Sequence, residues 1–184
     1  MNAENLTVSF TDLSLDSFKG IVFPGGFSYA DVLGSARGWA ATLKFNDQLR
    51  IKLEHFKARN NTFSLGVCNG CQLLALLNWV GSDSSSDKSS SGGSESSNGT
   101  QGTVLVQNDS GRFESRFTSV IIEESPSIML QGMKGSNLGV WVAHGEGKFT
   151  FKHSGVEKEL EENSLVALRY TDDDGKPTER SVFL

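Results

Sequence analysis

Residues 65–72 read Leu-Gly-Val-Cys-Asn-Gly-Cys-Gln, and this stretch decides the predicted fold. An apolar run over residues 63–67, typical of a short buried strand, leads into Cys68, and a helical apolar run over residues 73–79 follows. Glycines lie two positions before and after Cys68, and they permit a sharp turn because glycine has no Cβ to clash in a strained conformation. The thiol at such a corner projects from the sheet edge, and the helix N-terminus favours its thiolate. We therefore expect a nucleophile elbow that carries sulfur in place of a serine oxygen.

Cys68 and Cys71 form a Cys-x-x-Cys pair that has more than one interpretation. A cysteine in an apolar stretch is usually a small buried hydrophobe, and Cys71 stands beside Leu73 and Leu74. A redox dithiol or half of a zinc site would need further ligands, and the sequence has no second cysteine pair and no nearby histidine. Bracketing glycines are of no use to a core cysteine. We predict that Cys68 is reactive, that Cys71 is a core residue and that no metal is bound.

Composition limits the classes of protein to which the chain can belong. Its 184 residues suffice for one domain with a substantial core. A net charge of −5 and a pI of about 5.2 argue against a nucleic-acid-binding surface. No apolar run approaches the ~18 residues that span a membrane, and the N-terminus lacks a signal-peptide pattern. Two cysteines, one of them needed as a free thiol, indicate a reducing compartment, and we expect a cytoplasmic protein.

The first half of the chain alternates strand and helix patterns. Strands are predicted at residues 6–10, 18–23 and 63–67, and helices at 36–43, 46–59 and 70–79, with Asn46 as an N-cap. This order predicts a parallel sheet with right-handed crossovers, and function is expected where its strands end. The second half changes to strand-like segments at residues 104–107, 112–123, 138–143, 148–151 and 165–170, with an acidic helix at 154–163. A serine-rich stretch between the halves lacks apolar residues, and we predict a disordered surface insertion there.

A cysteine nucleophile needs oxyanion donors and a base. The backbone N–H of Asn69 is one candidate donor, and an N–H of the Gly25-Gly26 loop, after the strand ending at residue 23, is another. Among three histidines, His144 ends a predicted strand, and Glu146 is two residues further on, on the same side of an extended backbone. The pair could act as base and orienting group, or its side chains could simply hydrogen-bond the backbone of a glycine turn. Spacing alone does not choose between these interpretations.

Five blocks of sequence resemble the glutaminase domain of the phosphoribosylformylglycinamidine synthase family, which acts in de novo purine biosynthesis. They comprise residues 23–34 (Phe-Pro-Gly-Gly-Phe-Ser-Tyr-Ala-Asp-Val-Leu-Gly), 66–72 around Cys68, 110–114 (Ser-Gly-Arg-Phe-Glu), 141–147 and 170–179. The resemblance is to the large eukaryotic type, in which this domain is one part of a long chain. It implies an amidotransferase domain over residues 18–179 with a low-complexity insertion at 82–102, an N-terminal remnant at 1–17 and a tail at 180–184.

The resemblance implies a flavodoxin-like, three-layer α/β fold of the class I glutamine amidotransferases, here incomplete. It implies that Cys68 attacks the side-chain amide of glutamine, releases ammonia and forms a glutamyl thioester that water hydrolyses. Gly26, with its neighbour Gly25, and Asn69 would supply the oxyanion site, and Gln72 would line the glutamine site. Ammonia would pass, in cis or in trans, to a synthetase region that amidates formylglycinamide ribonucleotide. ATP and Mg²⁺ would belong to that region, so no cofactor is expected in this segment.

The chain departs from the family pattern at the catalytic histidine. In the family this residue lies in a Pro-His-Pro-Glu-Arg segment that is missing here, and the segment at the amino end is short as well. We interpret the Glu-Arg at residues 179–180 as what remains after an internal deletion, which makes Glu179 a remnant of the triad glutamate. The thiol would then lack its usual base, and we expect little glutaminase turnover unless His144 substitutes.

Two other classes of function compete with the active glutaminase. The first is an impaired fragment or binding module that still docks on a synthetase region, which the missing histidine favours. The second is a cysteine hydrolase or chaperone-like protein with the same sheet topology, which would not be expected to keep both the 25–31 block and the block around Cys68.

Overall fold

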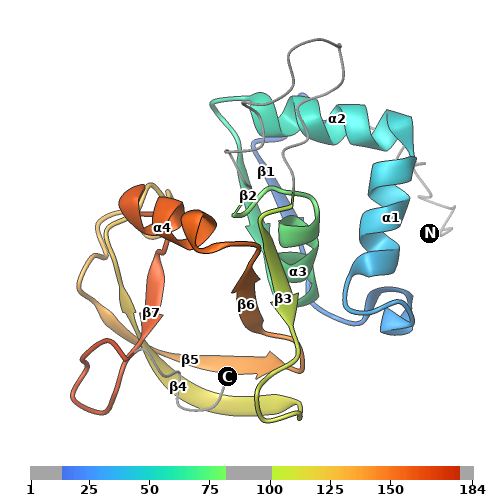
Figure 1. Cartoon of the computed structure of the whole chain (residues 1–184). Coiled ribbons are helices and arrows are strands. Elements are labelled where there is room, and N and C mark those ends of the chain that lie inside the picture. The colour runs from blue at the N-terminus through green and yellow to red at the C-terminus, as the bar shows by residue number, and fades with distance from the viewer. Residues whose placement is uncertain (1–13, 82–100, 179–184) are drawn as a thin grey trace, which may run out of the picture. The chain divides into compact units, whose positions relative to one another are not determined.

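The computed structural model describes residues 14–81 and 101–178, and the chain divides into two compact units, Met1–Leu73 and Leu74–Leu184 (Figure 1). Several predictions lie outside the described residues: the strand at 6–10, most of the N-terminal remnant, nearly all of the serine-rich insertion, Glu179 and the tail at 180–184. No helix in the described part of the chain is long and apolar enough to cross a membrane.

The first unit is built on a parallel pair of strands, β1 (Gly20–Phe23) and β2 (Phe63–Gly66). Gly20 is paired with Phe63 and Phe23 with Gly66, so both strands end at the same edge. The ladder extends one bond further, because the N–H of Val67 donates to the carbonyl of Phe23 at 3.0 Å. The predicted strand–helix–strand order is confirmed for this pair, and it brings the loop after β1 beside the corner after β2.

Two helices, α1 (Arg37–Phe45) and α2 (Asp47–Ala58), connect these strands. The predicted N-cap of α2 is confirmed, because the side chain of Asn46 accepts a hydrogen bond from the N–H of Leu49 at 3.1 Å. The buried residues Leu49, Leu53 and Phe56 follow one another at the spacing of one helix face. Burial of this apolar face stabilises α2, because intrinsic helix propensity alone gives a helix of this length little stability.

Helix α3 (Asn69–Leu76) begins directly after Cys68, one residue before the predicted start, and ends three residues earlier than expected. Leu73, Leu74 and Ala75 are buried, which explains why the sequence after the cysteine is apolar without interruption. A left-handed residue, Asn78, follows the helix and ends it.

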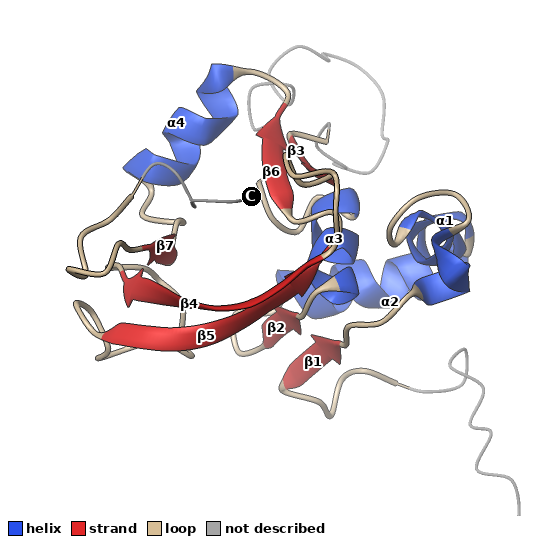
Figure 2. Cartoon of the chain, turned by 90° about the horizontal axis from the view of Figure 1, so that it is seen from below, coloured by secondary structure: helices blue, strands red, loops and turns tan. Residues whose placement is uncertain are grey.

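The second unit contains two antiparallel sheets. Strand β4 (Glu114–Ile122) lies between β5 (Asn137–His144) and β7 (Leu168–Tyr170), and β3 (Thr103–Val106) pairs with β6 (Lys148–Phe151). Figure 2 shows β4 and β5 as a long, curved pair. Val120 and Ile122 of β4 are buried, as is Val156 of α4 (Ser154–Glu162). The predicted change of pattern after residue 103 is therefore confirmed.

The molecule is a mixed α/β protein with small sheets. Within the described residues, parallel pairing is confined to β1 and β2, and the ladders of the second unit are antiparallel. The sequence predicted a parallel sheet from the strand–helix alternation of the first half, whereas the residues described after α3 form four successive strands before α4 and β7.

Candidate active site

Cys68 occupies the sharp corner between β2 and α3. Its φ is 52°, in the left-handed region that costs an L-residue roughly 1–2 kcal/mol, and its side chain is exposed. The carbonyl of Cys68 accepts hydrogen bonds from the N–H groups of Cys71 and Gln72, at 2.9 and 3.2 Å, so the helix starts at once. A strained residue between a strand and a helix, with an exposed thiol, has the geometry of a nucleophile elbow.

Gly70 allows α3 to approach β1 closely. A Cβ at this position would overlap the carbonyl oxygen of Phe23 and would lie 2.6 Å from its carbonyl carbon. Only a residue without a side chain fits between this helix turn and the strand. Gly70, two residues after Cys68, is therefore required by the packing of α3 against β1 as well as by the geometry of the turn.

The loop after β1 reaches the thiol. A methyl group on Gly25 would lie 3.1 Å from the Cβ of Cys68 and 3.9 Å from its Sγ. Gly26 has a φ of 130°, a conformation for glycine alone, and open space where a side chain would be. The structure therefore places the predicted Gly25-Gly26 loop and Cys68 side by side at one edge of the parallel pair.

Asn69 and Gln72 are buried polar residues beneath the corner, 2% and 7% exposed. Asn69 Nδ2 donates to Oε1 of Gln72 at 3.1 Å and to Oδ1 of Asp31 at 3.3 Å. The N–H of Ser28 donates to Oδ1 of Asn69 at 3.4 Å. These contacts join the loop after β1 to the start of α3. The side chains of Asn69 and Gln72 therefore have a structural role in joining these segments. The group of Asn69 that is expected to donate to the oxyanion is its backbone N–H, not its side chain.

Cys71 is partly buried, in agreement with the predicted core character. Burial raises the pKa of the Cys71 thiol, and the neighbouring charge on Cys68 raises this pKa further. At neutral pH the thiolate fraction of Cys71 is therefore small. The two cysteines differ in exposure, and this difference favours reaction at Cys68.

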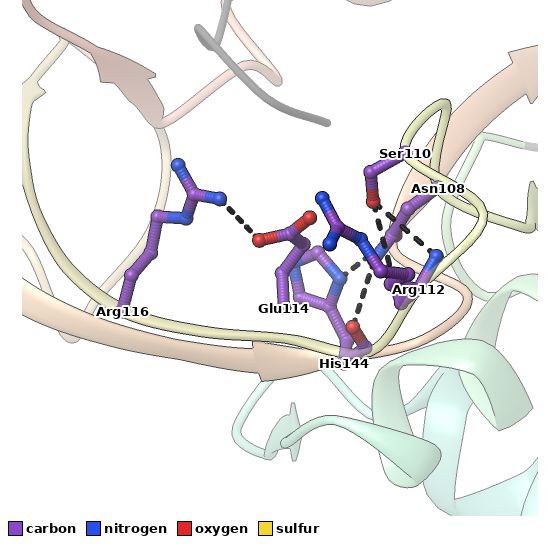
Figure 3. A network of polar contacts seen from close by, with 6 residues as sticks. All are labelled: Asn108, Ser110, Arg112, Glu114, Arg116 and His144. Atoms are coloured by element: carbon purple, nitrogen blue, oxygen red, sulfur yellow. Dashed lines mark hydrogen bonds and ion pairs between the residues drawn. The ribbon is translucent and has the colours of Figure 1, made fainter.

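His144 lies at the end of β5 in the second unit, where Asn108 organises a separate polar network (Figure 3). Asn108 is 3% exposed, and its Nδ2 donates to the carbonyl oxygens of Arg112 and His144 at 3.0 and 2.8 Å. Its Oδ1 accepts from the N–H of Gly147 and lies 3.0 Å from His144 Nδ1. Because Nδ2 is the donating atom, Oδ1 must accept, and His144 carries its proton on Nδ1 and a lone pair on Nε2.

The charge state of His144 follows from its surroundings. Partial burial lowers the pKa of the imidazole, while the backbone hydrogen bond of His144 and the charge of Glu114, its partner across β4 and β5, oppose that shift. The pKa of Glu114 is itself lowered, first by a hydrogen bond from Ser110 and then by the hydrogen bond and charge of Arg116. His144 is therefore neutral near pH 7, which is the form that can accept a proton.

The other predicted site residues are placed as follows. Glu146 is two residues beyond His144 in the same turn, and the structure gives Asn108 as the partner of the His144 Nδ1. Glu179 lies outside the described residues. Among the described residues, no group of three or more His, Cys, Asp or Glu side chains could hold a metal ion. The sequence analysis assigned no role to Asp31, which lies within the block at residues 23–34, or to Asn108, which is two residues before the block at 110–114.

These features define a class of protein. The chain belongs to the family of CobB/CobQ-like glutamine amidotransferase domains, whose pattern matches residues 2–183. A solved structure of PurLQS from Thermotoga maritima resembles the fold with a TM-score of 0.61 at 23% sequence identity, covering 91% of this chain and 64% of that one.

Curated relatives carry a more particular name. The chain is 54% identical over 172 residues to the probable phosphoribosylformylglycinamidine synthase, chloroplastic/mitochondrial, of Arabidopsis thaliana. It is 50% identical over 168 residues to the phosphoribosylformylglycinamidine synthase of Homo sapiens. These matches cover 94% and 91% of this chain but 12% of each relative, so the chain corresponds to a small part of those proteins.

Proposed function

We propose that this chain is the glutaminase part of a phosphoribosylformylglycinamidine synthase and that Cys68 is its nucleophile. The observation that carries the proposal is an exposed thiol on a left-handed corner, directly beside the Gly25-Gly26 loop. Family membership gives the thiol a substrate class, the side-chain amide of glutamine.

The proposed reaction forms a C–S bond and breaks the C–N bond at the carboxamide carbon of glutamine. The thiolate of Cys68 attacks the carboxamide carbon, and the resulting oxyanion is stabilised by the backbone N–H groups of Asn69 and Gly26. The amide nitrogen takes up a proton and leaves as ammonia, which yields a glutamyl thioester. Water then hydrolyses the thioester to glutamate and regenerates the thiol, while Gln72 lines the substrate site.

The remaining parts of the assignment extend beyond the described residues. We assign the domain a flavodoxin-like, three-layer architecture, and its serine-rich insertion at residues 82–102 lies almost entirely outside the described residues. Ammonia passes to a synthetase region, in cis or in trans, which uses ATP and Mg²⁺ to amidate formylglycinamide ribonucleotide. The exposed thiol requires a reducing compartment, for which we propose the cytoplasm.

The site also needs a general base. Glu179 is the proposed remnant of the triad glutamate of the family. His144 is the proposed substitute base, since it is neutral with its Nδ1 proton held by Asn108, and Glu146 is the proposed orienting group for His144. Loss of general-base assistance typically costs ~10²–10⁴-fold in rate.

A glutamate-release assay on the purified chain tests the proposal, with Cys68→Ala as the blank. We expect slow turnover, together with a glutamyl adduct on Cys68 that acid quenching traps and mass spectrometry detects. Addition of a synthetase region from a relative should raise the rate. Glutamate release by Cys68→Ala at the unmodified rate, or an adduct on Cys71 alone, would contradict the assignment of the nucleophile.

A second candidate function is a catalytically impaired module that docks on the synthetase region. In that case the chain would bind the synthetase region in a pull-down, and glutamate release would stay at the level of the Cys68→Ala blank in the complex.

A further inference from the structure

We propose that Asp31 is a positioning residue of the glutaminase site. Its carboxylate holds a left-handed turn of the loop after β1 against Asn69, and this contact sets the relative positions of the two proposed oxyanion donors. The inference rests on the proposed function, and it adds a residue that acts through Asn69.

The backbone of the turn is unusual. Tyr29, Ala30 and Asp31 are three successive residues with φ values of 53°, 52° and 50°, although none is glycine. L-residues avoid this region because the Cβ approaches the backbone carbonyl too closely. The turn therefore persists only where other contacts hold it, and strain of this kind concentrates at functional sites.

The carboxylate of Asp31 supplies such contacts. Its Oδ1 accepts from Asn69 Nδ2 and from the N–H of Ala36, each at 3.3 Å, and its Oδ2 accepts from Ser35 Oγ at 3.5 Å. Ala36 is also left-handed and is fully buried at the start of α1. Hydrogen bonds to a carboxylate are stronger than neutral ones. One side chain thus ties the turn to the start of α1 and to the residue after the nucleophile.

Asn69 connects this turn with the thiol. Asn69 is 2% exposed, and both polar atoms of its side-chain amide form hydrogen bonds. Oδ1 accepts from the N–H of Ser28, while Nδ2 donates to Asp31 and to Gln72. The backbone N–H of the same residue is one proposed oxyanion donor, and Gly26 is two residues before Ser28. Removal of the Asp31 carboxylate should release the turn and move the loop that carries Gly26 relative to Asn69.

The test compares two reagents on the purified chain. A chloroketone analogue of glutamine needs the oxyanion donors to polarise its carbonyl group, whereas iodoacetamide needs only an accessible thiolate. The ratio of the two rates at Cys68 therefore reports the alignment of the oxyanion donors. A change in overall stability affects both rates alike and leaves their ratio unchanged. Asp47→Ala is the matched control, because Asp47 is in the same unit, its side chain is 81% exposed and it pairs with Arg50.

For Asp31→Ala we expect the rate ratio to fall by about 10²-fold, the effect of a misplacement of about 1 Å. Asp31→Asn keeps an acceptor oxygen in the same place and should retain the ratio within a few fold. Asp31→Glu keeps the charge but displaces it, and it should lower the ratio by about tenfold. This variant also carries the test if Asp31→Ala does not fold. Asp47→Ala should match the unmodified chain.

Three results would overturn the inference. An unchanged ratio in Asp31→Ala and Asp31→Glu shows that the donors keep their alignment without the carboxylate. Equal losses with both reagents show a general loss of structure. If the unmodified chain reacts no faster with the chloroketone than with iodoacetamide, and glutamine gives no protection, the proposed glutaminase function fails, and the positioning role fails with it.

Discussion

The close approach of α3 to β1 leads to a quantitative prediction for Gly70→Ala. The added Cβ would lie 2.6 Å from the carbonyl carbon and 2.8 Å from the Cβ of Phe23, and it would overlap the carbonyl oxygen. Carbon atoms in contact are ordinarily separated by about 3.5–4.0 Å, so the helix must move by about 1 Å. The obstructing atoms are mostly backbone, and they cannot rotate away.

Two free-energy terms oppose each other in this variant. Alanine in place of glycine in a helix gains about 1 kcal/mol from propensity. Overpacking of a well-packed interior costs typically about 1–3 kcal/mol, and a clash with backbone belongs at the upper end of that range. The clash therefore outweighs the propensity gain, and we expect a net destabilisation of about 2 kcal/mol.

Gly155→Ala is a closely matched control. Gly155 is also the second residue of its helix, α4, but the nearest atoms to an added Cβ belong to the ring of the exposed His153, at 2.9 Å. That ring can rotate aside, so the propensity term remains, and Gly155→Ala should be neutral or stabilising by up to about 1 kcal/mol.

Urea unfolding measures both variants. For Gly70→Ala, the fluorescence of Trp39, which makes an edge-to-face contact with Phe23 at 5.8 Å, reports on the first unit when Trp79 and Trp141 are replaced by phenylalanine. For Gly155→Ala, the fluorescence of Trp141, which makes an edge-to-face contact with Phe117 at 5.5 Å, reports on the second unit when Trp39 and Trp79 are replaced. The midpoint for Gly70→Ala should fall clearly below that of the same background. A difference of less than about 0.5 kcal/mol, the size of an ordinary surface substitution, would refute the close contact between helix and strand.

Two further predictions concern titratable groups. Iodoacetamide should modify Cys68 faster than Cys71 near pH 7.5, because burial raises the pKa of the Cys71 thiol; peptide mapping measures this, and equal labelling would contradict the elbow geometry. The folded state lowers the pKa of His144 from its ordinary 6.5, so the unfolded chain binds the proton more readily. The contribution of His144 to the free energy of unfolding should therefore be fully present above pH 6.5 and should be lost as the pH falls through the lowered pKa. In urea unfolding at a series of pH values, His144→Gln should reduce this decline in the free energy of unfolding. An unchanged decline in the variant would show that burial of the His144 ring is not its cause.

Local patterns in the sequence predicted much of the first unit. The Asn46 cap, the buried face of α2 and the strand–corner–helix around Cys68 each depend on residues within one or two helical turns of each other. The strands of the second unit were found by alternation, for example β4 and β6, whose positions differ from expectation by two residues or fewer at each end. The pairing of these strands did not follow from the patterns, because registers such as Glu114 with His144 depend on contacts distant in sequence.

The sequence by itself determined where the exposed sulfur of Cys68 stands along the chain and why glycines surround it, since both follow from the conformational freedom of neighbouring residues. Only the tertiary structure decided which side chains support that sulfur's surroundings. Asp31 meets Asn69 across 38 residues, and Asn108 fixes the tautomer of His144 across 36. A buried amide or carboxylate must find a hydrogen-bonding partner, but many polar residues could serve, and the folded backbone alone selects the one within reach.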